Sequence, residues 1–472
     1  MQLIEKEQTM KSQDDASAAK SGPRCIFGAG NYRWVICALL FFATTINYID
    51  RQILSLLKPI LDDKMGWTNE QFGWINSLFQ GAYGMGLLWF GWYVDRQGVR
   101  KGYAVSMATW SLSAMAHSLI VLIPAGASVV LWGTTWGYTA LAVAAFGFCR
   151  ILLGVSEAGN FPAAIKGTAQ WFPKRERAFS TSIFNSGANV GAIVAPAIVP
   201  PIAFALGWQW AFIIAGLVGF VWLFFWLPMY DSPDKHRRVT AEELALIHSD
   251  PPDAGGDGRI AWLSLLKYRQ TWSFIFGKFL TDPVWWFFLI WLPDFFKQTR
   301  HLDIKKSWVH LVTIYAIVTV LSIVGGWVTG HLTKKGWTVT RARKTGMFIF
   351  ALCVLPIVFV SKVGDWGAVL LIGLACAAHA AWSANIFTTV SDMFPKKAVA
   401  SVTGLGGMAG SLGGMLFPIL TGIMLDHYKA AGNVTAGYNI LFGICACAYL
   451  VAFAVNHAFA PRFEPIRLDE EK

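Results

Sequence analysis

Six ionisable side chains lie inside stretches of the sequence that are otherwise apolar. They are three acids and three bases, namely Asp50, Arg51, Arg150, Glu157, Lys278 and Asp282. At the centre of a membrane-spanning helix, each such charge costs about 2.5–3.5 kcal/mol on insertion scales. A chain keeps these charges when they face one another or a water-filled cavity. The pattern therefore indicates a pathway for a charged solute.

The composition indicates that a lipid bilayer surrounds most of the chain. Hydrophobic residues make up 55% of the 472 residues and charged residues 14%, and the mean hydropathy is +0.47. A soluble protein of this length could not bury so much apolar surface. The seven Cys form no disulfide framework and no metal-ligand spacing, so we expect neither a metal nor a cofactor.

Twelve apolar runs are long enough to cross a bilayer as helices. We place them at residues 33–57, 71–94, 102–123, 138–165, 177–204, 208–230, 270–297, 307–332, 344–361, 366–393, 398–425 and 437–460. The expected fold is an all-α membrane protein with two pseudo-symmetric six-helix bundles, at 33–230 and 270–460. The polar stretch 231–269 is predicted to be a cytoplasmic linker, and 1–32 and 461–472 to be cytoplasmic tails.

The basic residues predict the orientation of the chain. With the N-terminus inside, most of the 39 Lys and Arg fall in cytoplasmic segments, as the positive-inside rule requires. Topology thus explains the net charge of +11, and no basic face outside the bilayer indicates a nucleic-acid partner. Residues 1–30 are polar and basic without a cleavage pattern, so we expect a tail rather than a signal peptide. We expect a multi-pass protein of the inner membrane with both termini cytoplasmic.

The two halves repeat each other's motifs. Trp171–Pro173 after the fourth run resembles Met393–Pro395 after the tenth, and Asn185–Pro196 in the fifth run resembles Gly407–Pro418 in the eleventh. Both pairs share one offset, since 393 minus 171 and 407 minus 185 each give 222. Repeated halves are typical of transporters that bind their solute between two bundles.

The loop between the second and third runs carries glycines and charges at close spacing. Its candidate conformational residues are Gly91, Asp95, Arg96, Gly98 and Arg100. Glycines permit a tight turn and a close helix approach, and Asp95 could cap a helix or pair with a base across the seam between the halves. A merely basic loop is the alternative. In pattern and position this loop resembles the signature loop of the major facilitator superfamily.

Within that superfamily, the sequence is most similar to the anion:cation symporter family and its hexuronate and sugar-acid transporters. The resemblance rests on Asn47–Arg51, Arg150–Ala158, Gly277–Pro293 and Trp382–Asn385, and it extends through nearly all twelve runs. It implies proton-coupled uptake of carboxylate-bearing solutes rather than enzymatic activity. It also implies that an Arg of the first run binds the anion and that acids of the first and fourth runs carry protons.

The chemistry of the buried charges agrees with these roles. Arg51 is the candidate ligand of the substrate carboxylate, because a guanidinium offers a bidentate fork. Asp50 and Glu157 are candidate proton carriers, since burial opposes ionisation of an acid. Arg150 would tune these acids, and Asp282 is a further candidate for proton coupling. The alternative is a structural ion-pair network that only holds helices together.

Other candidates would contact the body of the substrate. Lys278 could offer a second positive charge, or it could simply pair with Asp282 four residues later. The remaining candidates are Tyr83, Asn185, Asn189, His379, Trp382 and Asn385. Amides suit sugar hydroxyls and Trp can stack on a pyranose ring, although packing between helices would explain the same residues. We also expect Pro283 to break or bend the seventh run.

The expected function is proton-driven import of a sugar acid, either a hexuronate such as glucuronate or galacturonate, or a related aldonate or aldarate. The alternative is a major facilitator transporter for another organic anion, such as a C4 dicarboxylate, an aromatic acid or a phosphate ester. A membrane enzyme or a receptor would require a catalytic constellation or an added soluble domain, and the sequence shows neither. The expected partners are a small carboxylate, protons and the lipid bilayer.

Overall fold

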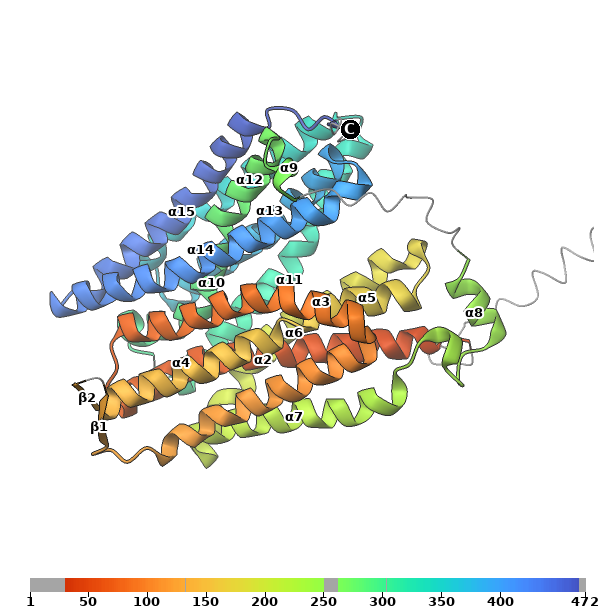
Figure 1. Cartoon of the computed structure of the whole chain (residues 1–472). Helices are drawn as coiled ribbons and strands as arrows, with labels where there is room; N and C mark the ends of the chain where they lie inside the picture. Colours follow the sequence, from red (N-terminus) through yellow and green to blue (C-terminus); the bar gives the residue numbers. More distant parts are fainter. Residues whose placement is uncertain (1–29, 132, 250–261, 303, 467–472) are drawn as a thin grey trace, which may run out of the picture.

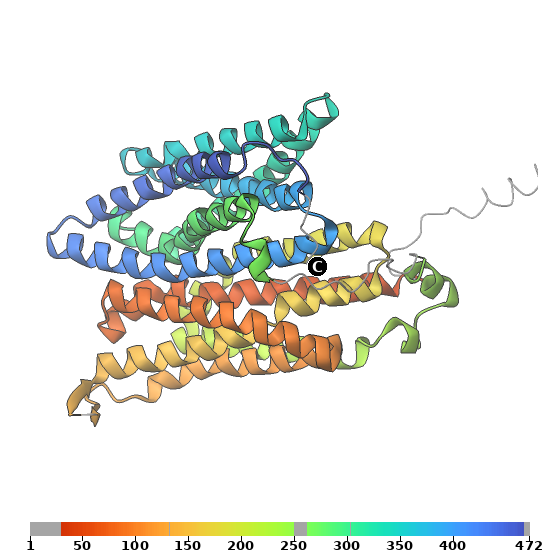
Figure 2. The same ribbon diagram turned by 45° about the horizontal axis from the view of Figure 1, so that its top comes forward.

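The computed structural model describes residues 30–131, 133–249, 262–302 and 304–466. Its helices form two bundles that lie against each other, one red to lime and one green to blue (Figures 1 and 2). The predicted segments 1–32, 231–269 and 461–472 lie partly outside the described residues.

The first bundle contains six labelled helices and a short 3-10 helix, His117–Leu122. The six are α2 (Tyr32–Met65), α3 (Asn69–Ala116), α4 (Tyr138–Glu157), α5 (Asn160–Trp171), α6 (Lys174–Leu206) and α7 (Trp208–Met229). The second bundle contains six more helices and the 3-10 helix Leu355–Lys362. These are α10 (Arg269–Arg300), α11 (Ile304–Lys334), α12 (Val339–Val354), α13 (Asp365–Met393), α14 (Lys396–Ala430) and α15 (Val434–Phe459).

Eleven helical segments within the described residues are long and apolar enough to cross a membrane. One of them, Asn69–Leu122, has 54 residues and is interrupted at Gly98, where φ is +81° and ψ is +163°. The chain turns back there (Figure 1), so this segment makes two passes and accounts for the predicted second and third runs. A positive φ favours glycine because it has no Cβ. The predicted all-α membrane fold is confirmed.

Two ends of the molecule can be told apart by their small elements. One end, here called the hairpin face, carries the antiparallel strands β1 (Ser128–Leu131) and β2 (Thr134–Gly137), with Ser128 opposite Gly137. The other end, the linker face, carries α8 (Ala241–Ile247) and α9 (Trp262–Leu265), which come between the two bundles in the sequence (Figure 1). The hairpin was not predicted, although its β-branched residues favour strands.

The bundles meet along three helix pairs: α3 with α14, α6 with α11, and α2 with α10. Small residues allow the close approach. A Cβ on Gly422 of α14 would lie 2.7 Å from the carbonyl carbon of Asn69 in α3. Within the second bundle, a Cβ on Gly413 would lie 2.6 Å from the Phe279 carbonyl oxygen in α10.

Of the break or bend predicted at Pro283 in the seventh run, the break does not occur. Helix α10 continues through both Pro283 and Pro293 as one 32-residue element. Proline removes the hydrogen bond to the carbonyl four residues earlier, which is that of Phe279. Gly413 packs against this carbonyl and against the Pro283 ring, so neighbouring backbone covers the freed group inside the protein.

The two glycines of the signature loop should respond differently to alanine. Neither would bring a Cβ within 4 Å of another group, but only Gly98 has a positive φ. We expect Gly98→Ala to destabilise the purified protein by about 1–3 kcal/mol, and so to lower its thermal unfolding midpoint. Gly91→Ala should leave the midpoint unchanged or raise it, because alanine is the better helix former. Equal midpoints for the two variants would contradict this assignment.

Candidate functional site

A cavity of about 620 Å³ lies between the two bundles, a size typical of small-molecule sites. Helices α2, α6, α10, α11 and α13 provide its wall. Its polar or charged lining residues include Asn185, Asn189, Lys278, Asp282, Ser322 and His379. Within α10, Lys278 lies nearer the linker face, whereas Trp285 and Trp286 line the deeper end. The cavity therefore extends from the middle of the molecule toward the linker face.

One ion pair lies on the cavity wall. Lys278 Nζ is 2.8 Å from Asp282 Oδ1, one helical turn later on α10, and both side chains line the cavity. Lys278 also lies 4.4 Å from the Phe387 ring centroid. Asp282 packs against Gly410 of α14, which has no room there for a Cβ. The expected pairing and the expected cavity position therefore both occur.

The other four predicted charges lie together in the first bundle. Arg51 Nε donates to Glu157 Oε2 at 2.8 Å, and Trp110 Nε1 donates to Asp50. Arg150 Nη2 lies 3.5 Å from the Arg51 carbonyl oxygen. All four charged side chains are buried, and two acids balance two bases. Such a group is tolerated in a membrane because its charges sum to zero.

This charge cluster is not fully paired. Among the described residues, four of its side-chain atoms have no hydrogen-bond partner: Asp50 Oδ1, Arg51 Nη2, Arg150 Nε and Glu157 Oε1. Most buried polar atoms in proteins are paired, so open ones of this kind call for a functional explanation. Each of these atoms can take one further hydrogen-bond partner.

Aromatic rings separate Arg51 from the cavity. Its Cζ lies 4.3 Å from the ring centroid of Tyr83, 5.3 Å from that of Tyr48 and 5.7 Å from that of Trp286. Tyr48 and Trp286 also line the cavity. Arg51 thus lies one layer of side chains behind the cavity wall, and Tyr83 contacts Arg51 without lining the cavity in this conformation.

The predicted residues of α13 divide between the cavity and the core. His379 lines the cavity, stacks on Trp285 at 5.3 Å, and places Nδ1 2.7 Å from the Tyr449 hydroxyl. Trp382 is fully buried and Asn385 donates to its own helix at Ala381 O, and neither lines the cavity.

Trp382 and Asn385 do not line the cavity because they lie on another side of α13. Ser383 faces the cavity, and at 100° per residue Trp382 and Asn385 lie about 100° and 200° away from it around α13. Asn185 and Asn189 of α6 both line the cavity, because a spacing of four residues keeps them on one face.

The signature loop makes its contacts inside the first bundle. Asp95 pairs with Lys166 of α5 at 2.8 Å rather than across the seam. Arg100 donates to the Leu227 carbonyl at 2.6 Å, which ties the loop to α7. The Arg96 guanidinium stacks 4.7 Å from the Trp92 ring centroid. A Cβ on Gly91 would meet no other group, so no close approach requires this glycine, whereas Gly98 provides the expected tight turn through its positive φ.

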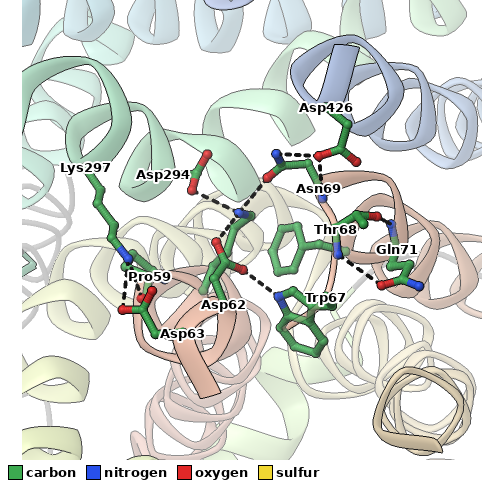
Figure 3. Close-up of polar contacts among 12 residues, drawn as sticks. Pro59, Asp62, Asp63, Trp67, Thr68, Asn69, Gln71, Asp294, Lys297 and Asp426 are labelled. Carbon is green, nitrogen blue, oxygen red and sulfur yellow. Dashed lines mark hydrogen bonds and ion pairs between the residues drawn. The ribbon is translucent and has the colours of Figure 1, made fainter. Parts of the chain in front are cut away.

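A second charged cluster, which the sequence did not predict, lies on the hairpin face. Lys58 of α2 is fully buried and its ammonium donates to Asp62 at 2.6 Å, Asn69 at 2.8 Å and Asp294 of α10 at 2.9 Å (Figure 3). Asp294 also accepts from the Tyr438 hydroxyl at 2.6 Å. This cluster joins the two bundles. Both Lys58 and Asp294 stand near the ends of predicted runs, where charges are ordinary.

A carboxylate from the second bundle caps a helix of the first. Asp426 of α14 accepts from the backbone N–H group of Asn69 at 3.0 Å (Figure 3). It also accepts from the backbone N–H group of Glu70 at 2.7 Å, in the same first turn of α3. Helix N-termini favour such anions because their N–H groups lack partners. Helix α3 also has a capping box of its own, formed by Thr68 and Gln71.

A further cross-bundle contact joins the same two helices as the Lys58 cluster. Lys297 of α10 donates to the Pro59 carbonyl of α2 at 2.6 Å (Figure 3). We call the cross-bundle contacts of Lys58, Asp294, Lys297 and Asp426 the hairpin-face latch. On the linker face, by contrast, Arg343 pairs with Asp392 inside its own bundle, as Asp95 does with Lys166.

Comparisons with known proteins agree with this architecture. The family model of the Major Facilitator Superfamily matches residues 40–418. The chain is 26% identical over 438 residues to the "Probable galactarate/D-glucarate transporter" of Escherichia coli (strain K12), covering 89% of this chain and 94% of that protein. It is 27% identical over 424 residues to the "Hexuronate transporter" of the same strain, covering 88% and 90%.

A solved structure of a bacterial homolog of the human lysosomal transporter Spinster, inward-facing and occupied, has a TM-score of 0.69. It is 14% identical and the match covers 92% of this chain and 98% of that chain, which shows the fold alone. The resemblance predicted from the signature loop, and within it the similarity to sugar-acid transporters, is confirmed.

Removing the latch lysine should open the hairpin face. Lys58→Met leaves Asp294 buried without its cation, a loss of about 3–5 kcal/mol for a pair of this kind. We expect a longer distance between spin labels placed at Val130 and Ala431 on a cysteine-free background. Lys64→Met is the matched control, since Lys64 is an exposed base at the same end of α2. An unchanged distance in Lys58→Met would show that these contacts do not hold the bundles together.

Proposed function

Because the chain belongs to the Major Facilitator Superfamily, whose members are membrane transporters rather than enzymes, we propose that it imports a sugar acid by proton symport. The main support is the position of the cavity, which a cationic side chain and two amides line and which aromatic rings separate from a buried ion pair. The proposed substrate class comes from the names of the relatives, which are transporters of hexuronate and of galactarate or glucarate.

The cavity suits a carboxylate that carries hydroxyl groups. Lys278 is the cation on the wall, and it would exchange Asp282 for the carboxylate of the substrate. The amides of Asn185 and Asn189 offer both donors and acceptors to hydroxyls. Trp285 and Trp286 present ring faces on which a sugar ring can stack. Trp382, Asn385 and Tyr83 would take part only after the wall rearranges.

Coupling to protons follows from competition for Arg51. A substrate carboxylate that passes Tyr48 and Trp286 would displace Glu157 from the guanidinium. A buried carboxylate without its cation is strongly disfavoured, so Glu157 would take up a proton as the anion binds. Release of the anion would return Arg51 to Glu157 and expel the proton. Asp50 and Arg150 would adjust this exchange by charge, since both lie in the same cluster.

The latch and the cavity suggest the transport cycle. In this conformation the latch holds the bundles together at the hairpin face while the cavity extends toward the linker face. Opening the latch would expose the site to the opposite side of the membrane. The moving units of the proposal are residues 33–230 and 270–460. The linker face and both termini would be cytoplasmic, in the inner membrane.

Transport assays with matched solutes test the substrate class. We expect a proton gradient to drive glucuronate into proteoliposomes, and other sugar acids to compete. Glucose and galactose are the matched controls, because they offer the same hydroxyls without the carboxylate. If no sugar acid competes but another organic anion does, the proposed substrate class is wrong.

The role of Glu157 can be separated from folding and binding. Glu157→Gln retains a hydrogen-bond acceptor for Arg51 but cannot exchange a proton. We expect it to abolish accumulation driven by a pH gradient while substrate counterflow continues. Glu242→Gln, which removes an exposed acid of α8, is the control, and it should retain both accumulation and counterflow. Normal accumulation against a gradient by Glu157→Gln would exclude this proton carrier.

The role of Lys278 predicts a different signature. Lys278→Met removes the cation on the wall, and we expect the half-saturating sugar-acid concentration to rise about tenfold or more. Lys335→Gln, which removes an exposed base outside the cavity, should leave that concentration unchanged. An unaltered value in Lys278→Met would mean that the lysine serves only its pair with Asp282.

A further inference from the structure

A second hollow, of about 570 Å³, lies at the linker face of the second bundle. It is formed where α12 begins and α15 ends, and it shares no lining residue with the transport cavity. Its lining includes Thr340, Arg341, Lys344, Phe453, His457 and Arg462. Neither the transport cycle nor the proton exchange proposed above uses any of these residues.

The hollow has an excess of positive charge. Within the described part of the chain, Arg341 and Lys344 form no ion pair with a carboxylate: Arg341 stacks 4.3 Å from the Trp337 ring centroid, and Lys344 donates to the Asn456 side chain at 2.5 Å. Glu464 is the acid among the lining residues, and it lies 3.7 Å from Arg462 in an exposed pair. Exposed pairs of this kind contribute little, so the hollow is left with bases that lack counter-ions.

The hollow is also partly apolar and its wall is held in place. Phe453 lines it, and the Lys344 ammonium lies 4.5 Å from the ring centroid of the buried Phe463. Two hydrogen bonds donated by backbone N–H groups hold the chain after α15 in place. The Phe463 N–H donates to Thr340 Oγ1 at 3.0 Å, and the Ile466 N–H donates to the Met393 carbonyl at 2.8 Å.

The hollow lies where one candidate membrane span begins and another ends. The candidate span Val339–Lys362 begins beside the hollow, and the span Val434–Phe459 ends there. Basic side chains at this depth attract anionic lipids by about 1 kcal/mol each. Guanidinium and ammonium groups are both common ligands of phosphate. A ligand with a phosphate and an apolar tail fits the bases and the aromatic rings together.

We propose that this hollow binds the headgroup of an anionic phospholipid. Arg341 and Lys344 contact the phosphate oxygens, and the first turn of α12 adds the positive end of its helix dipole. The acyl chains leave along Phe453 toward the bilayer. Free phosphate shares the headgroup chemistry but lacks the apolar tail, so the two sources can be separated by experiment.

The test is a titration of the delipidated full-length protein in a non-ionic detergent. The ligands are dihexanoyl phosphatidylglycerol, dihexanoyl phosphatidylcholine and inorganic phosphate, and the readouts are the thermal unfolding midpoint and bound lipid by native mass spectrometry. We expect only phosphatidylglycerol to raise the midpoint and remain bound. Equal effects of phosphatidylcholine would overturn the proposal, and equal effects of inorganic phosphate would assign the site to a free phosphate instead.

Matched variants locate the binding. The double variant Arg341→Gln/Lys344→Met should weaken phosphatidylglycerol binding about tenfold or more. Lys335→Gln removes a nearby exposed base that does not line the hollow and should bind as the unaltered protein does. If the double variant does not fold, Arg341→Gln alone, at an exposed position, should still weaken binding measurably. Unchanged binding in a folded variant would overturn the proposal.

Discussion

Charge inside a low-dielectric bilayer must be compensated, and this constraint governs how the chain is arranged. The structure meets it in three ways. Arg51 and Glu157 pair in the first bundle beside Asp50 and Arg150, Lys278 and Asp282 pair on the cavity wall, and Lys58 is shared by acids of both bundles. Only the third arrangement couples the bundles directly, so a relative motion of the bundles would break the Lys58–Asp294 pair and spare the other two arrangements.

The three arrangements also differ in what can disturb them. The pair on the cavity wall can be reached by a solute, whereas the pair behind Tyr48 and Trp286 can be reached only when these rings move. In the proposed function, an anion would therefore meet Lys278 before Arg51. That order would favour proton uptake late in binding, after the solute has already lost most of its contact with water. The order of these contacts, rather than any single residue, would make the coupling between anion and proton transport obligatory.

Much of the fold could be predicted from the sequence, because membrane spans follow from length and composition. The turn at Gly98 was predictable as well, since glycine and charge cluster there. It was harder to infer which side of each helix faces the cavity. A helix that is apolar around its whole circumference gives no periodic signal, so Trp382 and Asn385 were assigned to the cavity although they face the core. Lys58 and Asp294 were overlooked because charges at the ends of spans are ordinary, and their partnership needs a contact between residues 236 positions apart.

The cap that Asp426 provides to α3 has a consequence for how the molecule moves. The first turn of α3 has two sets of hydrogen-bond partners. One set is Thr68 and Gln71 of its own bundle, and the other is Asp426 of the opposite bundle. In the proposed cycle, Asp426 would leave when the bundles separate and water would replace it, but Thr68 and Gln71 would stay in place. The end of the helix could thus detach and dock again without fraying, so each turnover would move a preformed surface instead of refolding one.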